Sequence, residues 1–232
     1  MAEKDDMLVA ARPASRDLAP PMTQKNNVAP NDTVAPTPTP TECAQPRRFS
    51  DFATVGEALA YAAAGKRGLN FHDPRGRLVR AYSYRELRDD AIATAYRLIA
   101  AGIRPGDRIA LIAETGAEFA ALFFGTIHAG AWPVPLPLPT SFGGRDSYVG
   151  QLVVQLESCD PALLFFPPDI AAMAIEAAEA KGVTPVDWDE FAARPAPVAP
   201  LPEQKSDETC YLQYSSGSTR FPHGVAVTHA AL

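Results

Sequence analysis

The chain has 232 residues, with 21 lysines and arginines against 27 aspartates and glutamates, and a formal net charge of -6. That charge argues against a nucleic-acid partner, which would require a basic surface to neutralise phosphates. Hydrophobic residues make up 47% of the chain, a share typical of globular proteins and too high for a wholly disordered one.

The N-terminal segment differs from the rest of the chain in composition. Residues 1–46 contain 8 of the 23 prolines and no Phe, Trp or Tyr. Such a segment cannot bury enough apolar surface to offset the entropy of ordering it, so we expect a disordered, proline-rich tail over 1–46 and a folded domain over 47–232. The segment also lacks the apolar stretch of a signal peptide, and we expect a cytoplasmic protein.

The folded part begins with two helices on either side of a hairpin. Thr54 and Glu57 have the spacing of a capping box, which predicts a helix through Tyr61. Strand-like segments at 68–73 and 77–82 flank an Asp-Pro-Arg-Gly turn and predict a hairpin. A second capping box at Ser83 and Glu86 opens an amphipathic helix.

From residue 108 onward, continuous apolar strands alternate with helical segments. We predict strands at 108–113, 131–136, 162–166 and 183–188, and helices at 117–128, 148–158 and 168–181. This alternation predicts an α/β fold, with a mostly parallel sheet covered by helices on both faces. The uncharged stretch 119–142 contains four prolines in its second half, so we expect no membrane span. His128 lies among apolar residues, where a hydrogen-bonded core histidine is more common than a catalytic one.

Residues 215–224 form the segment whose composition indicates a chemical role most clearly. Four hydroxyl residues and two glycines lie between predicted strands at 209–214 and 225–228. Small residues let backbone N–H groups converge on an anion, and hydroxyls add donors with little bulk, so the segment suits the phosphates of a nucleotide. From composition alone, a solvated loop between two strands is an equal alternative. The spacing matches neither a Walker A loop nor a nucleophile elbow.

Residues 211–225 resemble the phosphate-binding signature YTSGSTGxPKG of the AMP-forming adenylate ligases, the superfamily of acyl-CoA synthetases, luciferases and adenylation domains. Seven positions match: Tyr214, Ser216, Gly217, Ser218, Thr219, Pro222 and Gly224. Arg220 replaces a glycine of the signature and His223 replaces its lysine. An arginine at that position resembles the fatty acyl-AMP ligase branch, as does the Pro-Val-Pro-Leu-Pro-Leu-Pro run at 133–139.

The resemblance implies that 47–232 is the N-terminal portion of the AMP-binding (adenylation) domain, within the large domain of such a ligase, and ends just after the phosphate-binding loop. It implies activation of a fatty acid by ATP with Mg, giving acyl-adenylate and pyrophosphate, and transfer of the acyl group to an acyl carrier protein. The phosphate-binding residues would be Ser215, Ser216, Gly217, Ser218, Thr219, Arg220, His223 and Gly224. The catalytic and metal-binding residues of the family would lie outside this chain, so we expect the chain alone to be inactive.

Two alternatives remain open. The chain could be part of a fatty acyl-CoA synthetase, with coenzyme A as the acceptor, or a non-enzymatic remnant that serves as an interaction module. No cluster of Cys and His indicates a metal or redox site, because the three cysteines are far apart in the sequence.

Overall fold

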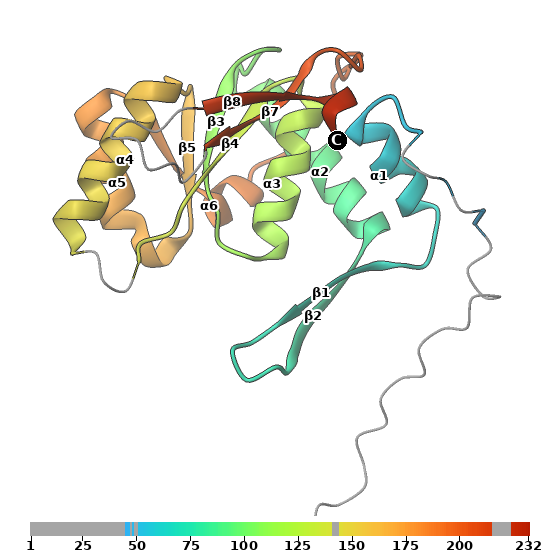
Figure 1. The fold of residues 1–232 in the computed structure, drawn as a ribbon, viewed down its shortest axis with the longest axis horizontal. Helices are drawn as coiled ribbons and strands as arrows, with labels where there is room; N and C mark the ends of the chain where they lie inside the picture. Colours follow the sequence, from blue (N-terminus) through green and yellow to red (C-terminus); the bar gives the residue numbers. More distant parts are fainter. Residues whose placement is uncertain (1–44, 47, 49–50, 141–143, 215–223) are drawn as a thin grey trace, which may run out of the picture. The chain divides into compact units, whose positions relative to one another are not determined.

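The computed structural model describes residues 45–46, 48, 51–140, 144–214 and 224–232 (Figure 1). The expected tail falls almost entirely outside the described residues. Two residues at its end are described: Gln45 donates from Nε2 to the carbonyl of Tyr61 at 2.7 Å, and the Tyr61 hydroxyl donates to the carbonyl of Pro46. Gln45 and Pro46 therefore contact Tyr61 of the first helix.

The first four elements confirm the predicted order of helix, hairpin and helix. They are α1 (Val55–Ala63), β1 (Gly68–His72), β2 (Leu78–Ser83) and α2 (Tyr84–Ala100). The second capping box forms as predicted, since Glu86 N–H donates to Ser83 Oγ and Ser83 N–H donates to Glu86 Oε2. At α1 the Thr54 cap forms, but the carboxylate of Glu57 accepts from the amide of Ala53 rather than from Thr54.

A parallel four-stranded sheet forms the centre of the fold. Its strands are β3 (Arg108–Ile112), β4 (Trp132–Leu136), β5 (Leu163–Phe166) and β6 (Thr184–Asp187), in the spatial order β4-β3-β5-β6. The connecting helices are α3 (Ala117–His128), α4 (Arg145–Cys159) and α5 (Ala171–Lys181). Every neighbouring pair in this sheet is parallel, which confirms the predicted α/β architecture.

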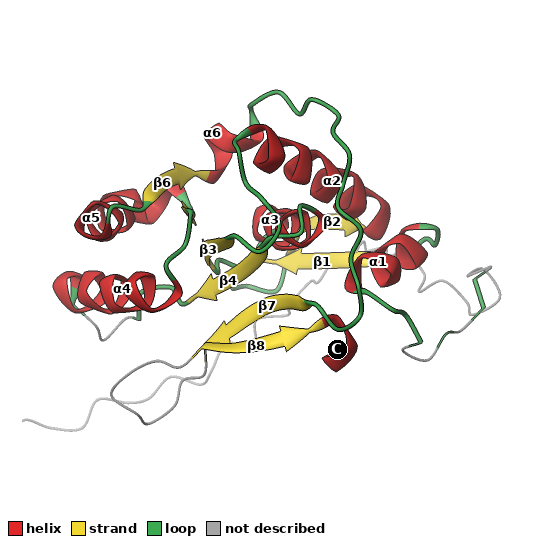
Figure 2. Ribbon diagram, turned by 90° about the horizontal axis from the view of Figure 1, so that it is seen from above, coloured by secondary structure: helices red, strands yellow, loops and turns green. Residues whose placement is uncertain are grey.

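The sheet divides the apolar core into two layers. Along β3, Ile109 and Leu111 face a cluster with α2 and α3, while Ala110 and Ile112 face a cluster with α4 and α5. This follows from the alternation of side chains along a strand. Figure 2 shows α4 beside α5, apart from α2 and α3. Both faces of the sheet are therefore covered by helices, as the sequence predicts.

Three short elements differ from the predictions. A 3₁₀ helix at Pro168–Ile170, with Pro168 at its first position, precedes α5, so the α-helix begins at Ala171 rather than at residue 168. A short helix, α6 (Trp188–Ala192), follows β6, where the sequence pattern predicts no helix. After β8 (Gly224–Thr228) comes a 3₁₀ turn at His229–Ala231, in which Thr228 makes no side-chain cap.

No helix in the described part of the chain combines the length and the apolar character needed to cross a membrane. The longest described helix, α2, has a polar face with several charged residues. The uncharged stretch that begins in α3 continues into the β4 strand of the sheet.

Candidate phosphate-binding site

Tyr214, which precedes the predicted phosphate-binding segment, and Gly224, its last residue, are paired in the structure. β7 (Thr209–Tyr214) and β8 form an antiparallel ribbon in which Tyr214 is the register partner of Gly224. Ser215, Ser216, Gly217, Ser218, Thr219, Arg220 and His223 lie outside the described residues, whereas Gly224 is described. Tyr214 and Gly224 thus lie next to each other at one end of a two-stranded ribbon.

Tyr214 joins this ribbon to the end of α4. Its hydroxyl lies 2.9 Å from Oγ of Ser158, in the last turn of α4. A β-carbon placed on Gly224 would lie 3.4 Å from the Tyr214 ring, so the ring covers the α-carbon of Gly224. Burial raises the pKa of Tyr214, and the hydroxyl remains protonated near neutral pH. Tyr214 therefore contacts both the end of α4 and the far end of the predicted segment.

Other side chains of β7 fix the ribbon against the sheet. Leu212 and Tyr214 pack against the apolar cluster beneath α4. The ring of Tyr211 meets Phe123 of α3 at a centroid distance of 5.6 Å in an edge-on arrangement. β7 lies beside β4, as Figure 2 shows. The ribbon is consequently held by both helical layers, which gives the predicted phosphate segment a well-anchored base.

Two histidines are near this region, and the structure gives each of them a packing role. His229 is 5% exposed and its Nδ1 accepts a hydrogen bond from the amide of Val55 at 3.2 Å. His128 is only partly exposed, and its Nε2 has no hydrogen-bond partner among the described residues, contrary to the expected hydrogen-bonded state. Burial lowers the pKa of both imidazoles, so both are neutral at pH 7. His229 also borders a cavity of about 400 Å³ with Trp132 and Cys210.

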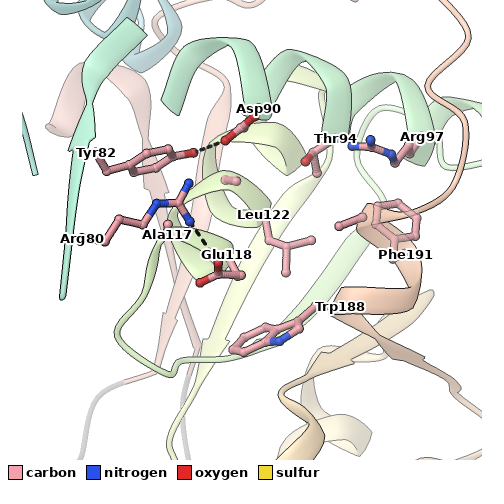
Figure 3. Close-up of a pocket in the computed structure, with 12 residues that line it drawn as sticks. Arg80, Tyr82, Asp90, Thr94, Arg97, Ala117, Glu118, Leu122, Trp188 and Phe191 are labelled. Atoms are coloured by element: carbon pink, nitrogen blue, oxygen red, sulfur yellow. Dashed lines mark hydrogen bonds and ion pairs between the residues drawn. The ribbon is translucent and has the colours of Figure 1, made fainter. Parts of the chain in front are cut away.

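A separate cavity of about 200 Å³ lies between β2, α2, α3 and α6 (Figure 3). Leu122, Trp188 and Phe191 supply apolar lining, and Arg80 forms an ion pair with Glu118 at 3.2 Å on one side. The Tyr82 hydroxyl donates to Asp90 at 2.7 Å. The pKa of Tyr82 is raised, mainly by burial and also by this hydrogen bond. The lining residues come from segments far apart in the chain, so no local motif indicates this cavity.

The described residues offer no evident magnesium site. Within the ranges the structure describes, no group of three or more His, Cys, Asp or Glu side chains is placed to hold a metal ion. We therefore assign no magnesium ligand to these residues. The donors that the sequence predicts for a nucleotide phosphate belong to the hydroxyl- and glycine-rich segment that follows directly after Tyr214.

A parallel sheet covered on both faces, followed by two paired strands on either side of a glycine- and hydroxyl-rich stretch of sequence, defines an α/β domain. The chain belongs to the AMP-binding enzyme family, whose model matches residues 62–232.

Relatives with known names agree with this assignment. A protein of Caulobacter vibrioides, provisionally named an acyl-CoA synthetase, is 40% identical over 198 residues, which cover 84% of this chain and 34% of the relative. A long-chain-fatty-acid–AMP ligase of Mycobacterium marinum is 33% identical over 188 residues, which cover 76% of this chain and 27% of that ligase.

A solved structure shares the fold. It comes from a study of fatty acyl-adenylate ligases from E. coli and L. pneumophila, is 39% identical and superposes with a TM-score of 0.76. The match covers 79% of this chain and 33% of that structure. The chain thus spans about a third of the length of the proteins it resembles.

Proposed function

We propose that this chain supplies the phosphate-binding portion of a ligase that activates a fatty acid with ATP, giving acyl-adenylate and pyrophosphate. The observation that carries the proposal is the register pair of Tyr214 and Gly224, which brings together the ends of a segment with the signature of the family. The names of the fatty acyl-AMP ligase relatives support a fatty acid as the substrate.

The chemistry explains why such a segment is required. The fatty carboxylate attacks the α-phosphorus of ATP, a new C–O–P linkage forms, and the bond to the leaving pyrophosphate breaks. Negative charge builds on the phosphoryl oxygens, and preorganised N–H and hydroxyl donors stabilise that charge. We assign this role to Ser215, Ser216, Gly217, Ser218, Thr219 and Gly224, with Arg220 and His223 as further phosphate contacts. Magnesium bound with ATP would neutralise part of the phosphate charge.

Two acceptors for the acyl group are to be distinguished. The replacement at Arg220 and the fatty acyl-AMP ligase relatives favour an acyl carrier protein. The Caulobacter relative, named an acyl-CoA synthetase, supports coenzyme A as the alternative. We place the reaction in the cytoplasm, where ATP is available. Because the chain spans about a third of its relatives, we propose that it does not complete the reaction by itself.

The experiment is a titration of the 15N-labelled chain with magnesium-ATP and with pyrophosphate, followed by the amide signals of 215–224. We expect these signals to shift saturably, and Arg220→Ala to weaken the binding several-fold. Arg104→Ala, at an exposed turn outside the segment, is the matched control and should bind like the unaltered chain. If saturating ATP and pyrophosphate leave the signals of 215–224 unmoved, the assignment of the segment is wrong.

A second measurement tests the reaction. Fatty-acid-dependent exchange of pyrophosphate into ATP should be absent for this chain. In a longer ligase that contains this sequence, acyl-adenylate should accumulate and pass to a carrier protein in preference to coenzyme A. Efficient formation of acyl-CoA would favour the alternative acceptor.

A further inference from the structure

The β1–β2 hairpin and the residues at its base carry a concentration of positive charge in an acidic chain. Between Lys66 and Glu86 the sequence has six lysines and arginines against two acidic residues, whereas the whole chain has a net charge of -6. In Figure 1 the hairpin extends away from the helices and the sheet. The charge balance of this projection is thus opposite to that of the rest of the molecule.

The end of the hairpin also exposes two large apolar side chains. Leu78 is 56% exposed and Val79 is 68% exposed. As neighbours on a strand they point to opposite faces of the ribbon. Closer to the body the same strand is covered, since Tyr82 is 1% exposed and packs with Leu87 and Ala91 of α2. The hairpin therefore presents apolar surface on both faces near its turn.

The turn itself is well ordered by internal hydrogen bonds. The Asp73 carboxylate accepts from the amides of Arg75 and Arg77 at 2.8 and 3.0 Å, and its second oxygen pairs with the Arg77 guanidinium at 2.7 Å. Arg80 is paired with Glu118. Among the described residues, Arg75 at the turn has no ion-pair partner, and neither do Lys66, Arg67 and Arg85 at the base. These four cations are available to an anionic partner.

We propose that the β1–β2 hairpin docks this protein on the surface of an anionic lipid bilayer. Leu78 and Val79 would enter the headgroup region, and Arg75 would contact lipid phosphates. The basic residues at the base lie roughly 17 Å from the turn, as five residues of strand require, so they contribute a longer-range attraction weakened by salt.

The arrangement favours a bilayer over an acidic protein. A flat protein surface would cover one face of the ribbon, whereas a bilayer surrounds an inserted turn and covers both Leu78 and Val79. The inference goes beyond the proposed function and does not depend on it. For an enzyme that acts on fatty acids, such docking would place it where those acids partition.

The test is flotation of the chain with phosphatidylcholine vesicles that contain either no phosphatidylglycerol or 30% of it. We expect binding to the anionic vesicles at low salt, little binding to the neutral vesicles, and release at high salt. The double variant L78S/V79S should lose about tenfold or more in partitioning. Arg75→Gln should reduce partitioning onto the anionic vesicles about fivefold. The double variant K66Q/R67Q should reduce it by a smaller factor for each residue replaced.

Matched controls come from exposed sites elsewhere in the chain. Val198 is 84% exposed on the connection before β7, and Arg104 lies on the turn before β3. Val198→Ser and Arg104→Gln should bind vesicles like the unaltered chain. All the substituted side chains are exposed, and circular dichroism will confirm that the variants fold.

Three results would overturn the proposal. One is the absence of binding to anionic vesicles at low salt. Another is vesicle binding that L78S/V79S and Arg75→Gln leave unchanged. The third is hairpin-dependent binding to polyglutamate with none to vesicles, which would show that the partner is an acidic protein. Because none of these measurements involves ATP, failure here is distinguishable from failure of the proposed function.

Discussion

The backbone amide of Val55, the first residue of α1, donates a hydrogen bond to Nδ1 of His229 at 3.2 Å. His229 belongs to the turn after β8, so this bond ties the first helix of the fold to the last described turn. The amide at a helix start has no partner within the helix, and the imidazole supplies one. The bond requires Nδ1 to be unprotonated.

This requirement predicts a loss of stability in mild acid. Burial lowers the pKa of His229 and of His128 below their ordinary value, so the unfolded chain binds more protons. Stability from these groups is complete above about pH 6.5 and is lost as the pH falls toward their folded pKa values. We expect the Tm to fall by a few degrees between about pH 7.5 and 5.5, a range above that of the carboxylates.

Substitutions identify the source of that pH dependence. His229→Asn retains an acceptor near the position of Nδ1 and should reduce the difference in Tm between the two pH values. His72→Asn, at an exposed position, should leave the difference unchanged. If neither a His229 variant nor a His128 variant changes the difference in Tm between the two pH values, these histidines are not the source of the pH dependence.

The contact between α2 and α3 depends on a glycine. A β-carbon at Gly125 would lie 2.5 Å from Cβ of Thr94 and 2.8 Å from the carbonyl oxygen of Ala91. Gly125→Ala must separate the two helices, so we expect a loss of about 1–3 kcal/mol in the free energy of unfolding. Gly150→Ala on α4 is the control, because nothing lies within 4 Å of its β-carbon. In urea denaturation, Gly150→Ala should leave the free energy of unfolding unchanged or raise it slightly. Equal losses of this free energy in Gly125→Ala and Gly150→Ala would refute the packing argument.

The bond between Tyr214 and Ser158 can be measured by a double-mutant cycle. We expect Tyr214→Phe and Ser158→Ala each to cost about 0.5 kcal/mol, a low value because the bond is partly open to solvent. The double variant should cost little more than either single one. Tyr211→Phe retains its ring against Phe123 and should be neutral. Fully additive losses in chemical denaturation would mean that the two side chains do not interact.

The two described cysteines should resist modification in the folded state. Burial raises the pKa of Cys159 to about 11 and that of Cys210 to about 12, so little thiolate is present at neutral pH. In a Cys43→Ser variant, a disulfide reagent at pH 7.5 should react slowly with both thiols and quickly after addition of denaturant. Rapid reaction of either thiol without denaturant would show that its site opens readily.

The sequence predicts the central sheet well because the physical signal is strong there. β3 and β5 are continuous apolar runs, and a strand with helices on both sides needs apolar residues on both faces. The second capping box likewise marks the start of α2 at Ser83. Pattern and structure coincide where burial and local hydrogen bonding favour the same conformation.

Features set by tertiary packing are not visible in the sequence. α6 is only five residues long, and it forms because Asp187 caps it while Trp188 and Phe191 are buried against the sheet. The anchoring of Tyr214 on Ser158 joins residues that no motif connects. The cavity beside Arg80 depends on four elements at once. The family signature identifies the hydroxyl-rich segment in the sequence, but nothing in the sequence indicates that the preceding Tyr214 contacts α4.

The position of β3 also determines when the centre of the parallel sheet can form during synthesis. Ile109 pairs with Pro133 on one side and with Leu163 on the other, so the central strand acquires its second neighbour late in the chain. Contacts between distant residues slow folding, because closing the long intervening loop costs conformational entropy before the contact can compensate for it. A nascent chain that has reached only the end of α4 would hold β3 with one open edge and an incomplete core on the α4 side. The emergence of β5 from the ribosome is therefore the step at which β3 acquires its second neighbour and loses its open edge.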